Sequence, residues 1–147
     1  MAKYGKNELQ TVAASKPIIL DTINGCPRGF VLHNNETGVF TLRSTMNHFA
    51  RYELIFKANI AVPEGGTAGA ISVGIAQTGE VLPLSVATVT PTAAQEFNNV
   101  VSVETIDVPA GCCVNIAVEN TTESADLTTI ASPIDVQNAV LIINRIA

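Results

Sequence analysis

Residues 50–62, ARYELIFKANIAV, show the longest regular alternation of apolar and polar side chains in the sequence. Every even-numbered position from 52 to 62 is apolar, and the odd-numbered positions from 51 to 59 are polar, with Ile55 as the exception. Successive side chains of a strand point to opposite faces, so this period of two predicts a strand with one face in a core.

Residues 139–143, AVLII, break this rule near the C-terminus. In an extended strand Ala139, Leu141 and Ile143 would share one face, while Val140 and Ile142 would share the other. A strand with one wet face should alternate, so both faces of this run are expected to be covered. We therefore expect a central strand whose second face packs against other subunits.

The other apolar runs are short and separated by turn residues, and no segment shows a sustained helical period. This pattern predicts an all-β protein, an antiparallel two-sheet jelly-roll sandwich of about nine or ten strands. A single domain is expected over residues 11–147, after an N-terminal segment, residues 1–10. The further strand candidates are residues 9–15, 17–22, 30–34, 39–44, 70–77, 81–91, 98–108, 112–120 and 134–147.

The composition points to an assembled protein. Charged residues make up 14% of the 147 residues and hydrophobic residues 47%, whereas an ordinary domain has about 25% charged residues. Part of the surface is therefore expected to face other subunits, most simply in a homotrimer. The net charge of −5 divides into +3 for residues 1–57 and −8 for residues 58–147, which fits an acidic partner surface near the N-terminal region or an accident of composition.

The sequence argues against nucleic acid and membrane partners. Its basic residues are neither clustered nor interleaved with aromatic residues. A membrane-spanning helix needs about 20 apolar residues in a row, and neither such a run nor the apolar centre of a signal peptide is found. We expect no membrane partner and a protein made in the cytoplasm.

Candidate chemistry is sparse. The two histidines, His33 and His48, are not accompanied by a recognised nucleophile motif. Cys26, Cys112 and Cys113 lack zinc-ligand spacing, and Cys112 is expected to face the core with Val114. Glu123 and Asp126 form the one pair of acidic residues considered for calcium, and a solvated acidic loop is the preferred interpretation. We expect no enzyme activity, no cofactor and no bound metal.

Two resemblances add to this reading. The segments ARYELIFKANIAVP, DVPAGCCVNIAVEN and NAVLIINRIA, in this order, resemble the trimeric jelly roll of the tumour-necrosis-factor and complement-type globular heads. The opening MAKYGKNELQTVA, together with RYELIF and DVPAGCC, resembles small virion proteins of tailed phages and prophages of Gram-positive bacteria, a group associated with capsid decoration and head fibres. The sequence has no collagen-like or coiled-coil stalk, so direct seating on a capsid is the expectation.

These resemblances imply a structural virion protein, a capsid decoration protein that forms homotrimers on the outer surface of a phage head and binds its major capsid protein. Lys3, Tyr4 and Lys6 are the expected attachment residues. The expected trimer interface consists of Tyr52, Leu54, Phe56, Val140, Leu141, Ile142 and Ile143.

The alternative is a trimeric receptor-binding or adhesive head that recognises a host surface carbohydrate or protein. Sugar sites usually expose aromatic rings for stacking. The sequence has no Trp, two Tyr and five Phe, most of them inside strand patterns. The alternative is therefore the weaker of the two hypotheses.

Overall fold

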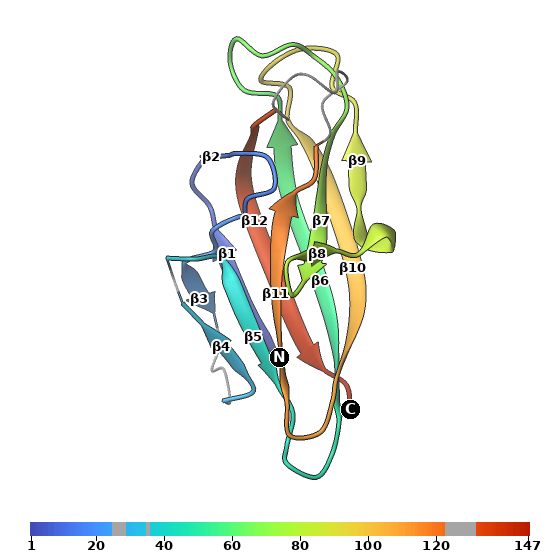
Figure 1. The fold of residues 1–147 in the computed structure, drawn as a ribbon. Helices are drawn as coiled ribbons and strands as arrows, with labels where there is room; N and C mark the ends of the chain where they lie inside the picture. The colour runs from blue at the N-terminus through green and yellow to red at the C-terminus, as the bar shows by residue number, and fades with distance from the viewer. Residues whose placement is uncertain (25–28, 35, 123–131) are drawn as a thin grey trace.

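The computed structural model describes residues 1–24, 29–34, 36–122 and 132–147, which form two antiparallel six-stranded sheets packed face to face (Figure 1). The all-β jelly-roll prediction is confirmed. More strands are found than the predicted nine or ten because several edge strands have only two or three residues. Cys26 and the Glu123–Asp126 pair lie outside the described residues.

Sheet A has the order β10-β6-β12-β1-β3, with β2 beside β12. Its strands are β1 (Ala2–Lys6), β2 (Gln10–Val12), β3 (Thr22–Asn24), β6 (Ala50–Ala61), β10 (Asn98–Val108) and β12 (Ile134–Arg145).

Sheet B has the order β4-β5-β11-β7-β8, with β9 also beside β7. Its strands are β4 (Val31–His33), β5 (Val39–Arg43), β7 (Ile71–Gln77), β8 (Glu80–Val81), β9 (Ala87–Val89) and β11 (Cys113–Asn120).

The predicted alternation of residues 50–62 is confirmed in β6. Tyr52, Leu54 and Phe56 are fully buried between the sheets, whereas Arg51 and Lys57 are exposed on the other side of the strand. The Tyr52 hydroxyl lies at the end of the core and donates a hydrogen bond to the Arg43 backbone carbonyl at 2.5 Å. This hydrogen bond links β6 of sheet A to β5 of sheet B.

Strand β12 lies in the centre of sheet A, between β6 and β1. A bulge between Gln137 and Val140, with Asn138 at φ 52°, shifts its register against β6. Before the bulge Val136 faces the core; after it, Leu141 does so. Because the bulge adds one residue, even-numbered side chains point into the core before it and odd-numbered side chains do so after it.

The N-terminal residues do not form the separate attachment segment that was predicted for residues 1–10. Strand β1 pairs with β12 on one side and β3 on the other, with Tyr4 opposite Leu141. The predicted boundary at residue 10 falls inside β2, which pairs with β12 as well. These hydrogen bonds and the buried Tyr4 side chain make the first residues an integral part of sheet A.

The prediction that Cys112 faces the core is wrong, because both Cys112 and Cys113 are exposed. Strand β11 begins only at Cys113, so Cys112 belongs to the preceding turn and does not take the inward position that strand alternation would give it. The Ser44 hydroxyl holds this turn by accepting a hydrogen bond from the Cys112 amide and donating to the Pro109 carbonyl.

Candidate functional site

The outer face of sheet A, which points away from sheet B, is the candidate functional surface. Strand pairing places Val103 opposite Ile55 and Ile55 opposite Ile142, forming one apolar row across β10, β6 and β12. The neighbouring row joins Val101, Lys57 and Val140 in the same way. We call the five apolar members the sheet A patch: Ile55, Val101, Val103, Val140 and Ile142.

Polar residues border the sheet A patch. Lys3 lies opposite Ile142 on β1, and Glu53 lies opposite Asn144 in the row beyond. Val101 and Val103 are 53% and 51% exposed, whereas Ile55, Val140 and Ile142 are half-buried by their neighbours. An apolar surface with a polar rim is typical of a protein–protein contact.

The predicted interface residues separate into two groups. Val140 and Ile142 belong to the sheet A patch and are available to a second subunit. The other five are at most 1% exposed in the core of a single chain, so their side chains leave no surface for another subunit. They are Tyr52, Leu54, Phe56, Leu141 and Ile143.

The three predicted attachment residues also lie in different environments. Tyr4 is buried beneath sheet A, so it has no surface to offer a capsid. The Lys6 ammonium donates to the Asp21 carboxylate at 2.7 Å, and this contact holds the pKa of Asp21 below its usual value. Lys3 stands beside the sheet A patch. The sequence could not reveal these placements because a polar N-terminal segment gave no sign of a central strand.

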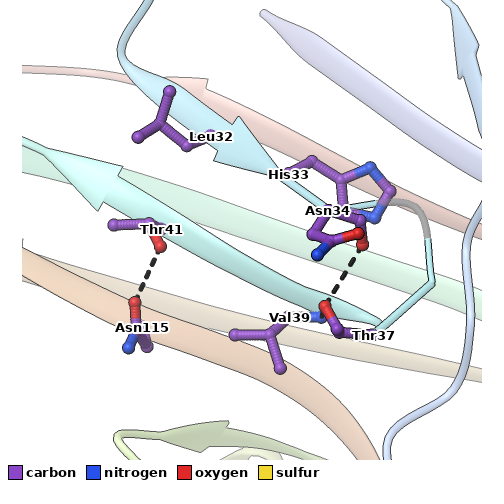
Figure 2. A pocket seen from close by; sticks show the side chains of 7 residues that line it. All are labelled: Leu32, His33, Asn34, Thr37, Val39, Thr41 and Asn115. Atoms are coloured by element: carbon purple, nitrogen blue, oxygen red, sulfur yellow. Dashed lines mark hydrogen bonds between the residues drawn. The ribbon is translucent and has the colours of Figure 1, made fainter.

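A second surface feature is an open hollow of about 290 Å³ on sheet B (Figure 2). The Thr41 hydroxyl donates to the Asn115 side-chain oxygen across neighbouring strands at 2.8 Å, and the Thr37 hydroxyl donates to the Asn34 carbonyl at 3.2 Å. These two pairs satisfy one another, whereas both ring nitrogens of His33 lack a partner among the described residues. The hollow is lined by Leu32, His33, Asn34, Thr37, Val39, Thr41 and Asn115.

His33 lies beneath this hollow in an aromatic cluster that joins the two sheets. Its ring stacks on Phe40 with 4.2 Å between centroids, and the edge of Tyr4 approaches it at 4.9 Å. The described residues provide no hydrogen-bond partner for either ring nitrogen or for the Tyr4 hydroxyl. Burial lowers the pKa of His33, and the carboxylate of Asp21 opposes this shift only in part.

We expect this histidine to make the protein less stable as the pH falls. The unfolded chain takes up a proton near the ordinary histidine pKa of 6.5, whereas the folded chain does so only at lower pH. Below 6.5 the unfolded state therefore binds more protons, and the free energy of unfolding decreases. Urea unfolding at about pH 7.5 and about pH 5 should show a larger loss for the wild type than for His33→Phe, which retains an aromatic ring. Equal losses in both proteins would contradict this assignment.

The described residues contain no cluster suited to hold a metal ion. No group of three or more His, Cys, Asp or Glu side chains among them is arranged to hold a metal ion. His48 is exposed in the loop before β6, whereas His33 is half-buried in β4. In the same part of the chain no helix is long and apolar enough to cross a membrane.

Comparison with known proteins gives the fold. No protein-family model matches the chain, and no curated protein matches it by sequence. Among solved structures, the globular domain of zebrafish complement 1qA protein is similar with a TM-score of 0.69 and 13% identity, over 99% of this chain and 96% of that one. The Eiger TNF from S. frugiperda is similar with a TM-score of 0.63 and 14% identity, over 99% and 91%.

At these identities the likeness concerns the fold alone. The resemblance to the tumour-necrosis-factor and complement-type heads is confirmed at that level, whereas none of these structures links the chain to phage virion proteins. The outer face of sheet A and the hollow on sheet B are therefore surfaces on a C1q/TNF-like jelly roll.

Proposed function

We propose that the protein is a non-catalytic structural protein that assembles into a homotrimer through the outer face of sheet A. The observation that carries this proposal is the sheet A patch, in which five apolar side chains from three neighbouring strands stand in register on the outside of the sheet. Covering it would also explain why the chain has so few charged residues. The similar solved structures support the fold on which this assembly would be built.

The proposed trimer is tested by the mass of the purified protein in light scattering at two concentrations about tenfold apart. We expect three times 15.4 kDa for the wild type. Ile142→Asp should give a folded protein of 15.4 kDa, because a carboxylate on the sheet A patch would be buried unpaired in the trimer but solvated in the monomer. A wild-type monomer at both concentrations, or a trimer of Ile142→Asp, would end the proposal.

Within this proposal, the trimer serves as a decoration protein on the outer surface of a phage capsid, and the partner is the major capsid protein. The support is the resemblance of the N-terminal, RYELIF and DVPAGCC segments to small virion proteins. Lys3 and Lys6 remain the proposed contacts with an acidic shell, while Tyr4 supports them from inside the sheet.

Co-sedimentation with purified tailed-phage heads tests the capsid role. Binding of a decoration protein should saturate at a fixed number of copies per head. Lys6→Glu should weaken this binding while leaving the mass of the trimer unchanged. The phage is not identified by the chain, so heads from prophage-carrying Gram-positive hosts would be the probe. If the protein forms a stable trimer but shows no saturable binding to any of these heads, the proposed capsid role is wrong and the proposed trimer is retained.

A further inference from the structure

The hollow on sheet B lies on the side of the sandwich that faces away from sheet A. Strand pairing places Leu32, Thr41 and Asn115 in one row across β4, β5 and β11. The volume of the hollow is about 290 Å³, just below the range of about 300–1,000 Å³ that is typical of small-molecule sites. The hollow is therefore of a size to take one small ring.

Two side-chain amide groups line the hollow with hydrogen-bond donors to spare. The side-chain oxygen of Asn115 accepts from the Thr41 hydroxyl at 2.8 Å, and that of Asn34 accepts from the Glu36 backbone amide at 3.2 Å. Neither side-chain NH2 group has a partner among the described residues. Asn115 and Asn34 lie on opposite sides of Val39 (Figure 2). A ligand over Val39 can therefore accept hydrogen bonds from two directions.

Aliphatic side chains supply the apolar part of the hollow. Leu32 is 50% exposed, and Val39 is half-buried at the start of β5. The ring of His33, the one aromatic lining residue, stacks on Phe40 in the core. A ligand in the hollow would therefore rest on methyl groups and not on an aromatic face, which gives a weaker contact.

The lining of the hollow is uncharged at neutral pH. His33 is its one titratable residue, and burial lowers the pKa of this ring. A charged ligand would lose hydration here without gaining an opposite charge, so a neutral ligand fits better. A sugar ring combines the required properties, because it is neutral, carries hydroxyl oxygens that accept hydrogen bonds, and has an apolar C–H face.

We propose that the hollow on sheet B binds one neutral sugar ring, a hexopyranose. Its hydroxyl oxygens accept hydrogen bonds from the side-chain NH2 groups of Asn34 and Asn115, and its apolar face lies on Leu32 and Val39. This activity goes beyond the proposed assembly and needs neither the trimer nor a capsid. A single ring binds weakly at such a site, and in the proposed trimer three hollows would increase the avidity for a surface with many sugar units.

The site is tested by methyl NMR of protein labelled at Leu and Val, titrated with the methyl glycosides of glucose, galactose, mannose and N-acetylglucosamine. At least one glycoside should shift the methyl signals of Leu32 and Val39 in a saturable way, with a Kd of about 1–10 mM. The signals of Leu9, which is 54% exposed and lies outside the hollow, should not move. Sorbitol, an open-chain polyol, should shift none of these signals, because the site recognises a ring.

A matched pair of variants assigns the binding to the hollow. Asn115→Leu removes one donor with little change in volume and should raise the Kd about 5- to 10-fold, the effect of one lost hydrogen bond. Asn47→Leu, the same change at an exposed position outside the hollow, should leave the Kd unchanged. The remaining methyl signals of both variants should match the wild type and so report an intact fold.

The outcomes separate this inference from the proposed function. The sugar site is wrong if no glycoside gives a saturable shift at Leu32 and Val39, if sorbitol shifts them equally, or if Asn115→Leu binds as tightly as the wild type. None of these results bears on the mass of the protein. A wild-type monomer in light scattering would conversely end the proposed trimer and leave the sugar site in place, because all of its residues belong to one chain.

Discussion

Leu141→Asp is expected to abolish folding, whereas the neighbouring Ile142→Asp leaves the fold intact. Leu141 is fully buried in the centre of sheet A, between Tyr4 of β1 and Phe56 of β6. The change removes about 2–5 kcal/mol of packing and places a carboxyl group in an apolar core. The sum approaches the total stability of an ordinary domain, about 5–15 kcal/mol.

Circular dichroism and the yield of soluble protein measure this difference. Leu141→Asp should be insoluble or lack a cooperative thermal transition, and Leu141→Met provides a control of similar volume that should fold. If Leu141→Asp unfolded cooperatively near the wild-type temperature while Ile142→Asp did not fold, the inner and outer faces of β12 would be exchanged relative to this structure.

Asn120→Asp should also be strongly destabilising, although it changes the shape of the side chain very little. Asn120 is completely buried at the end of β11. Its side-chain nitrogen donates to the carbonyls of Val12 at 3.0 Å and Ser132 at 3.1 Å, and its oxygen accepts from the Thr122 amide at 3.0 Å. A carboxylate loses both donors and faces two carbonyl oxygens, which should cost about 3–5 kcal/mol.

Urea unfolding at neutral pH measures this loss for Asn120→Asp. Asn144 is half-buried and its amide donates to the Glu53 carboxylate, so Asn144→Asp is not a fair control. Asn99→Asp on the exposed outer side of β10 is the matched change and should cost under about 1 kcal/mol. Comparable losses for the Asn120 and Asn99 variants would show that the buried hydrogen bonds do not hold the β2 region and residue 132 together.

The sequence was most informative where a single face of a strand is buried. Strand β6 follows the predicted alternation from Ala50 to Ile60, and the turn at Pro109–Gly111 separates β10 from β11 where Pro and Gly indicated it. When one face of a strand is buried, apolar side chains recur at every second position, and this repeat can be recognised in the sequence. This is why the fold class was predictable from the chain.

The sequence was least informative where pairing partners are distant. Nothing in residues 2–6 reveals that β1 completes the sheet beside β12, because Tyr4 stands among polar residues. The bulge at Asn138 hid which side of AVLII faces inward, so Leu141 and Ile143 were assigned to an interface together with Val140 and Ile142.

The central place of β12 also has a consequence for how the chain is made. Ribosomes deliver β1 and β6 long before residues 134–145, yet these two strands are joined only through β12. Until that strand emerges, each would expose an unpaired backbone edge, and such edges favour association between nascent chains. Productive folding of sheet A is therefore postponed until residues 134–145 have been synthesised, and slow translation of the segment between β6 and β12 would lengthen the period in which the unfinished sheet depends on chaperones.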